Sequence, residues 1–219
     1  LERSLRVARE ANLRLLEGYD LLLLGVVARS EDRLPAAEEH LKEARVFFGC
    51  EAGEFFCLDF GGNMKWRHRS KRAITSSPNF VDGLVIFGSA DYNVYALEAS
   101  SGWTVWKQRT GKPVVSSPAV SEKAAYIGSA DDNLYALDLR SGKILWKFET
   151  GDQIASSPAI YKNAIYFGSV DGFVYCIEMK DGKLRWKFKT EGAVISSPTV
   201  VDDVVYIGST DHNLYALTA

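Results

Sequence analysis

A 40-residue internal repeat constrains the fold of this chain more than any other feature. Four related segments, each opening on a Gly-Ser pair, fall in step at residues 88–97, 128–137, 168–177 and 208–217. A degenerate copy covers residues 48–58. Repetition at this period predicts an array of similar supersecondary units. Two further markers keep the same spacing: SSP triplets beginning at Ser76, Ser116, Ser156 and Ser196, and tryptophans at Trp66, Trp106, Trp146 and Trp186.

Each period contains four short runs that are typical of β-strands. In residues 114–149 the runs VVSSPAV, AAYIGS, NLYAL and ILWKF are rich in β-branched and aromatic residues, and turn residues separate them. Both alternating faces of the third run are apolar, with Leu134 and Ala136 on one face and Tyr135 and Leu137 on the other. Such a strand suits a sheet that is covered on both sides.

The turns between the runs also recur. Asp132-Asn133 joins the second run to the third, and Asn93 and Asn213 occupy the same place, where we expect asparagine to adopt a positive φ. Ser141-Gly142-Lys143 joins the third run to the fourth, with Gly102 and Gly182 in register.

Four antiparallel strands per repeat, buried on both faces, predict an all-β propeller of four-stranded blades. The tryptophan of each fourth strand is expected to pack against the neighbouring blade. Residues 46–219 hold three complete and two incomplete blades, because the first copy lacks the SSP strand and the last lacks the tryptophan strand. Either the natural chain continues into more blades, or the chain associates with itself through unpaired blade edges.

Residues 1–45 have a different pattern. Leu21, Leu24, Gly25 and Ala28 follow helical spacing, and Pro35 suits the first turn of a second helix. The segment 18–44 resembles one tetratricopeptide (TPR) unit, so a short N-terminal α-helical hairpin is expected to precede the propeller. A simple amphipathic hairpin that caps the first blade is the alternative.

Charge and hydropathy limit the classes of partner. The chain has 26 basic and 28 acidic residues, a net charge of -2 that gives no reason to expect nucleic acid. No apolar run approaches the roughly 20 residues of a membrane-spanning helix. Other proteins are therefore the expected partners.

The repeat, summarised as SSPxxxxxxxxYxGSxDxxLYALDxxSGKxxWKFxT, resembles the PQQ-like β-propeller repeat of quinoprotein dehydrogenases and of BamB-type assembly proteins. The resemblance covers residues 46–219 and implies the propeller architecture. Some members of that family carry pyrroloquinoline quinone with calcium, typically beside an adjacent cysteine pair, and others bind proteins without a cofactor. The cysteines here, Cys50, Cys57 and Cys176, are not adjacent and replace small residues of the repeat, so we expect them to be buried and no cofactor to be bound.

Other polar residues of the repeat favour structural roles. Asp91, Asp131, Asp171 and Asp211 occur once per blade, and we expect each to hydrogen-bond its own hairpin rather than to bind calcium. The paired serines are expected to begin the first strand and could ring a polar channel mouth. The three histidines, His40, His68 and His212, have unrelated contexts and predict no metal or catalytic site.

Departures from the repeat are the better candidates for function. Trp103 stands where the third and fourth blades have Lys143 and Lys183, in a turn that should be exposed, and an exposed tryptophan is a candidate contact residue. A basic run is expected in the connection between the first two blades and could meet an acidic partner; its residues are Arg67, His68, Arg69, Lys71 and Arg72.

The sequence favours a non-catalytic scaffold for protein–protein interaction, within a larger protein or assembly. Two alternatives remain open: a cofactor-binding part of a quinone-dependent dehydrogenase or quinone sensor, and a carbohydrate-binding propeller. The BamB-type resemblance favours an exported protein and the TPR-like helices a cytoplasmic one, so the compartment is not assigned.

Overall fold

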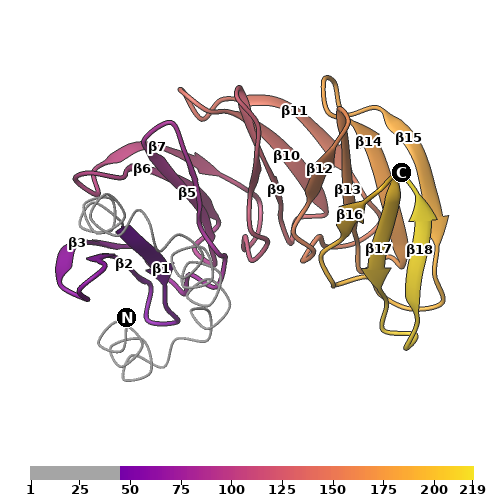
Figure 1. The fold of residues 1–219 in the computed structure, drawn as a ribbon, viewed down its shortest axis with the longest axis horizontal. Helices are drawn as coiled ribbons and strands as arrows, with labels where there is room; N and C mark the ends of the chain where they lie inside the picture. The colour runs from indigo at the N-terminus through magenta and orange to yellow at the C-terminus, as the bar shows by residue number, and fades with distance from the viewer. Residues whose placement is uncertain (1–44) are drawn as a thin grey trace, which may run out of the picture.

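Each 40-residue repeat forms one antiparallel sheet, and the sheets follow one another along an arc (Figure 1). The structure is a computed structural model that describes residues 45–219. Within these residues three sheets have four strands, and the first and last sheets have three. This agrees with the three complete and two incomplete blades expected from the repeat. We number the sheets as blades 1 to 5 in chain order.

The strands of the first two blades are short and sequential. Blade 1 consists of β1 (Arg45–Gly49), β2 (Glu54–Asp59) and β3 (Met64–Arg69). Blade 2 consists of β4 (Asn79–Val81), β5 (Leu84–Ser89), β6 (Asn93–Glu98) and β7 (Thr104–Arg109).

The remaining blades repeat this order. Blade 3 consists of β8 (Ala119–Val120), β9 (Ala124–Gly128), β10 (Asn133–Asp138) and β11 (Ile144–Glu149). Blade 4 consists of β12 (Ala159–Tyr161), β13 (Ala164–Gly168), β14 (Phe173–Glu178) and β15 (Leu184–Lys189), and blade 5 of β16 (Thr199–Val201), β17 (Val204–Gly208) and β18 (Leu214–Thr218). The last strands of blades 1 to 4, namely β3, β7, β11 and β15, lie along the convex side of the arc (Figure 1). We call them the outer strands.

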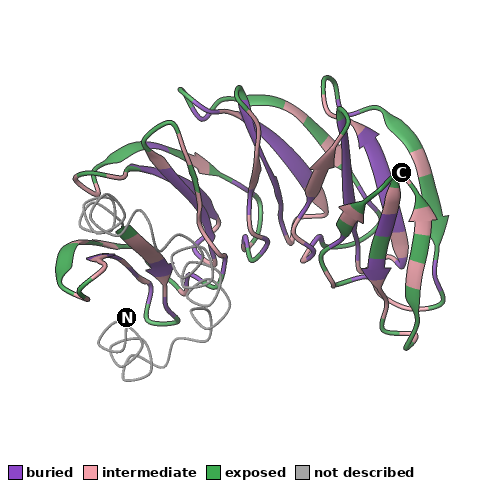
Figure 2. Cartoon of the chain, in the orientation of Figure 1, coloured by how far each residue is buried: buried purple, intermediate pink, exposed green. Residues whose placement is uncertain are grey.

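The hydrophobic core lies between the blades. Tyr135 and Leu137 on one face of β10 pack into a cluster shared with blade 2, and Leu134 and Ala136 on the other face pack against blade 4. Both faces of the middle strands are therefore buried, whereas the outer strands carry the exposed residues (Figure 2). The two-sided apolar pattern of the third strand is confirmed.

A tryptophan of each outer strand fastens its blade to the next one, as the repeat predicted. The indole Nε1 of Trp106 in blade 2 donates to the carbonyl oxygen of Leu139 in blade 3 at 2.7 Å, and Trp66 does the same to Ala99 at 2.9 Å. Gly142 lies against the Trp106 ring at a φ of 68°, and a Cβ on it would stand 2.6 Å from the ring. The tight turn and the inter-blade contact both require glycine there.

The asparagine in the turn before the third strand was expected to adopt a positive φ, and this expectation was wrong. The residue that precedes the asparagine has the positive φ, 70° at Asp132 and 72° at Tyr92. Asn93 instead donates its side-chain amide to the carbonyl oxygen of Asp91 at 2.8 Å. The asparagine therefore braces the turn instead of adopting its left-handed conformation.

The paired serines precede the first strand instead of beginning it. Ser76 is buried and accepts a hydrogen bond from the backbone N–H of Gly88 at 3.0 Å. The second serine of each pair links neighbouring blades, because the N–H of Ser77 donates to Ser117 Oγ at 2.8 Å and that of Ser117 to Ser157 Oγ at 2.9 Å. The serines thus hold the inner ends of the blades together.

Blades 1 and 5 lie at opposite ends of the arc (Figure 1). The outward face of blade 5 exposes Tyr206 by 41% and Leu214 by 74%, whereas their counterparts in blade 4, Tyr166 and Val174, are 1% and 0% exposed. This face is thus built like the covered faces of the other blades. Self-association through it stays a prediction.

The expected N-terminal helical hairpin lies outside the described residues. Between residues 45 and 219 there is no helix long and apolar enough to span a membrane.

Candidate functional site

Trp103 is the most exposed large apolar side chain among residues 45–219, at 78% exposure. It lies in the turn that leads into β7, and its carbonyl oxygen accepts a hydrogen bond from the N–H of Glu98 at 2.8 Å. Val105, two residues further on, is also exposed. The exposed turn that the sequence predicted for Trp103 is confirmed, whereas its role in binding stays a prediction.

The basic run is divided between two elements, which corrects its expected place in the connection. Arg67, His68 and Arg69 belong to β3, and only Lys71 and Arg72 lie in the connection to blade 2. The run continues the strand because β3 pairs along its length with β2, up to Arg69 opposite Glu54. Because successive side chains of a strand point to opposite faces, Arg67 and Arg69 lie at the surface and His68 points inward.

His68 faces blade 2 instead of solvent. Its ring lies edge-on to that of Tyr95, with centroids 5.4 Å apart, and its Nε2 atom is buried without a hydrogen-bond partner. Burial lowers the pKa of His68, which the nearby Asp91 carboxylate opposes and Lys107 reinforces. His68 is therefore part of the contact between blades 1 and 2 and does not extend the exposed basic surface.

We expect His68 to make the stability of this contact depend on pH. The folded state lowers the pKa of His68 below its ordinary value of 6.5. The contribution of His68 to the free energy of unfolding is therefore fully present above pH 6.5 and decreases as the pH falls from there towards the folded-state pKa. Replacing His68 with glutamine, the residue at this position in blade 2, should remove this loss. Urea unfolding at about pH 7.5 and 5.5 would measure it for both proteins. An equal decrease in His68→Gln would assign the effect to other groups.

The repeated aspartates brace their own hairpins, as expected. In blade 3 the hydroxyl of Tyr135 donates to Asp131 Oδ2 at 2.6 Å, and the N–H of Asn133 donates to Asp131 Oδ1 at 3.3 Å. The same tyrosine bond measures 2.7 Å to Asp91, 2.6 Å to Asp171 and 2.7 Å to Asp211.

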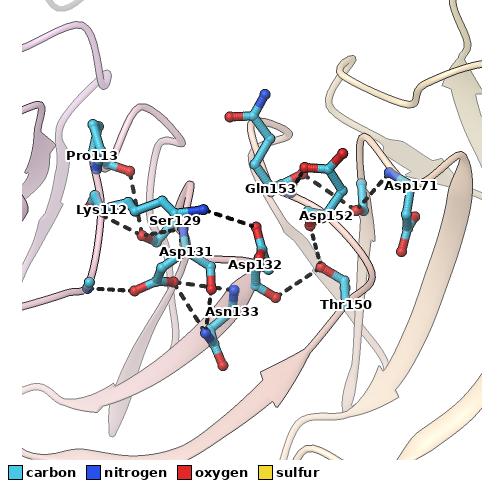
Figure 3. Close-up of polar contacts among 12 residues, drawn as sticks. Lys112, Pro113, Ser129, Asp131, Asp132, Asn133, Thr150, Asp152, Gln153 and Asp171 are labelled. Atoms are coloured by element: carbon cyan, nitrogen blue, oxygen red, sulfur yellow. Dashed lines mark hydrogen bonds and ion pairs between the residues drawn. The ribbon is translucent and has the colours of Figure 1, made fainter.

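Each aspartate also makes a contact that the sequence did not suggest. The N–H of Gly111 donates to Asp131 Oδ2 at 2.6 Å, so the carboxylate holds the chain segment that arrives from the preceding outer strand. Thr150, which directly follows β11, donates to the carbonyl oxygens of Asp132 at 2.9 Å and Asp152 at 2.6 Å (Figure 3). A hydroxyl recurs at this place every 40 residues, as Ser70, Thr110, Thr150 and Thr190, and this periodicity was the available signal.

These bonds lower the pKa of two of the carboxylates, Asp91 and Asp211. Burial by itself would raise the pKa of Asp91, but hydrogen bonds from Tyr95, Asn93 and the N–H of Lys71 outweigh it and lower the pKa below its ordinary value. The same balance lowers the pKa of Asp211 to about 2. Both carboxylates are thus ionised and committed to structural hydrogen bonds.

We expect Asp91→Ala to lower the free energy of unfolding by about 1–3 kcal/mol at neutral pH, because it leaves the buried Tyr95 hydroxyl without its acceptor. A lowered carboxylate pKa adds stability above pH 3.8 that is lost as the pH falls towards the folded-state value, so the difference from wild type should shrink in acid. Urea unfolding at several pH values would measure this. Asp181→Ala, which removes an exposed ion pair with the Lys183 ammonium and an exposed hydrogen bond from the Lys183 N–H, is the control and should cost little. Equal costs for the two variants would contradict the structural role of Asp91.

The cysteines are buried in separate places, as the sequence predicted. Cys57 and Cys176 are fully covered, and burial raises the pKa of the Cys57 thiol to about 11. Cys50 and Cys57 belong to blade 1 and Cys176 to blade 4, so no two of them form the adjacent pair typical of the quinone enzymes. Residues 45–219 also contain no group of three or more His, Cys, Asp or Glu side chains placed to hold a metal ion.

Three solved structures have folds similar to that of this chain. BamB from Moraxella catarrhalis superposes with a TM-score of 0.71 at 23% identity, over 80% of this chain and 54% of BamB. The computationally designed Ika8 protein gives a TM-score of 0.73 at 18% identity, over 80% of this chain and 55% of Ika8. The designed Ika4 protein gives 0.62 at 18% identity, over 68% of this chain and 92% of Ika4. The chain thus spans about half the length of BamB and Ika8, and the likeness concerns the fold.

Comparison with curated proteins found no significant match. A family model does match, over residues 28–219, which includes all five blades and begins within the segment 1–45. Its description is beta-alanine-activating enzyme, beta-propeller. Since the match covers most of the sequence and the blades have the propeller arrangement, the chain belongs to the beta-propeller family of the beta-alanine-activating enzyme.

Proposed function

We propose that this chain is a non-catalytic scaffold that binds another protein through the exposed surface of its outer strands. One contrast carries the proposal. The recurrent aspartates and serines are used for contacts within and between blades, whereas Trp103, which breaks the repeat, is exposed by 78%. Tryptophan is enriched among residues that dominate binding energy at protein interfaces.

The surroundings of Trp103 support a contact surface. Further apolar side chains are exposed at the beginnings of neighbouring outer strands, and Arg67 and Arg69 extend from β3. Exposed apolar residues with a polar and charged rim are typical of interaction sites. The exposed apolar side chains at these strand starts are Met64, Val105, Ile144, Leu145 and Leu184.

Capture experiments with matched variants test this proposal. The immobilised chain would be exposed to an extract of its source cells, and bound proteins would be identified by mass spectrometry. Trp103→Lys places the residue of blades 3 and 4 at this position and should abolish capture of the specific partner without changing the circular dichroism spectrum. Arg69→Ala should weaken it. Recovery of the same proteins by wild type and Trp103→Lys would contradict the proposed surface.

A ligand titration separates the scaffold from a quinone-binding protein. Pyrroloquinoline quinone with calcium is expected to leave tryptophan fluorescence unchanged apart from absorption by the quinone. Saturable quenching would contradict the proposal and support the cofactor-binding alternative.

A further inference from the structure

The exposed positions of the outer strands carry a concentration of positive charge. Nine of the seventeen exposed residues on these strands are lysine or arginine and one is glutamate, although the whole chain has 26 basic and 28 acidic residues. We call the nine cations the basic belt; they are Lys65, Arg67 and Arg69 on β3, Lys107 and Arg109 on β7, Lys147 on β11, and Arg185, Lys187 and Lys189 on β15. The eight remaining exposed residues are Met64, Thr104, Val105, Ile144, Leu145, Glu149, Leu184 and Phe188.

Most of this charge is not neutralised within the described chain. Lys65, Arg67 and Arg185 form ion pairs with carboxylates at 3.0, 3.7 and 2.7 Å. The other six cations have no ion pair with any carboxylate between residues 45 and 219. Lys107 and Lys147 lie 5.3 and 5.6 Å above tyrosine rings, contacts that orient the ammonium groups and leave their charge in place.

Protection of strand edges explains only part of this pattern. The outer strands are sheet edges, and charges there discourage pairing with other chains. Negative charges also discourage such pairing. Blades that alternated between positive and negative outer strands would be protected without repulsion between neighbouring blades. Here one sign predominates on four successive outer strands, which lie along the convex side of the arc (Figure 1), and this produces a positive field on that side.

The belt is a strip of three rows. Arg67, Lys107, Lys147 and Lys187 form the middle row across the blades, and the other two rows lie two residues before and two residues after it, each about 7 Å away along the strand. Acidic residues adjoin one edge of it, because the N–H groups of Glu98 and Asp138 donate to the carbonyl oxygens of Trp103 and Lys143, just before β7 and β11. A single acidic polypeptide can follow such a strip, whereas carboxylates at its edge disfavour a bulkier polyanion such as a nucleic-acid duplex.

We propose that the basic belt binds an extended acidic segment of a partner protein, with Val105 and Leu145 as apolar contacts between the cations. This inference rests on the proposed scaffold function and specifies the chemistry of its partner. Trp103 lies at the beginning of β7, beside the belt, and anchors the same segment.

Fluorescence anisotropy with a labelled peptide tests the belt directly. The probe is an alternating Glu-Ser peptide of about 16 residues, which spans roughly 50 Å when extended. Lys107→Glu with Lys147→Glu should weaken its binding at least about tenfold, and added salt should weaken wild-type binding. Lys123→Glu with Lys180→Glu is the control, because it changes the net charge equally at exposed lysines outside the belt and should have a small effect.

The outcomes separate this inference from the scaffold function. Equal weakening by both double variants, or absence of peptide binding, would overturn the belt, and Trp103-dependent capture from extract would then still support the scaffold. Belt-dependent binding of a single-stranded oligothymidylate in preference to the acidic peptide would assign the belt to nucleic acid and overturn the inference. Belt-dependent peptide binding without Trp103-dependent capture would retain the belt and reject the Trp103 surface.

Discussion

Replacing Trp106 with alanine is expected to lower the free energy of unfolding by about 3–5 kcal/mol. The indole is 7% exposed, fills the cluster between blades 2 and 3 and donates to the carbonyl oxygen of Leu139 at 2.7 Å. Its removal leaves a cavity and an unpaired carbonyl at the same contact. Urea unfolding followed by far-ultraviolet circular dichroism measures the effect.

Two controls separate the causes. Trp103→Ala removes the same side chain from an exposed position and should change stability by no more than about 0.5 kcal/mol. Trp106→Phe keeps an aromatic ring but removes the Nε1 donor, so its cost should be intermediate. Similar costs for Trp103→Ala and Trp106→Ala would show that the outer tryptophans do not fasten the blades.

Gly142→Ala is expected to lower the free energy of unfolding by about 2–5 kcal/mol. The φ of 68° is unfavourable for a residue with a Cβ, by about 1–2 kcal/mol. That Cβ would also stand 2.6 Å from the Trp106 ring, and overpacking of this kind adds about 1–3 kcal/mol. The same unfolding experiment measures the sum.

Gly83→Ala is the matched control for Gly142→Ala. Gly83 has a φ of 76°, but its Cβ would have no atom within 4 Å, so this variant measures the backbone cost alone. In a Trp106→Ala background Gly142→Ala should cost less than in wild type, since the ring it would strike is gone. If Gly142→Ala and Gly83→Ala lower the free energy of unfolding equally, the new Cβ at Gly142 does not disturb the packing against Trp106.

These predictions concern contacts that the repeat itself indicated. Recurrence of Trp106 and Gly142 every 40 residues pointed to one interaction made several times, and alternation along NLYAL indicated two buried faces. The burial of Cys57 and Cys176 followed from their place in the repeat, where other blades have alanine. In each case, a residue in one blade predicts its counterpart because the environments are the same.

The errors arose where local propensity was used alone. Asn93 was assigned the left-handed conformation from its intrinsic tolerance, but the turn places Tyr92 there and uses the asparagine amide as a brace. Arg67, His68 and Arg69 were assigned to a connection because they are charged, but pairing with β2 extends the strand through them. Hydrogen bonds between strands outweighed the polar character of these side chains.

The sequence by itself determined the propeller, its 40-residue blade, the tryptophan contact between blades and the exposure of Trp103, because all of these follow from a pattern repeated along one chain. Only the tertiary structure decided which polar groups meet across blades: the aspartate that holds the incoming segment at Gly111, the serine links such as Ser77 to Ser117, and the inward position of His68. It also brought the cations of four outer strands onto one convex side. Residues 20 or 40 positions apart become neighbours only when the blades pack against one another, so a local sequence pattern does not predict which of their polar groups meet.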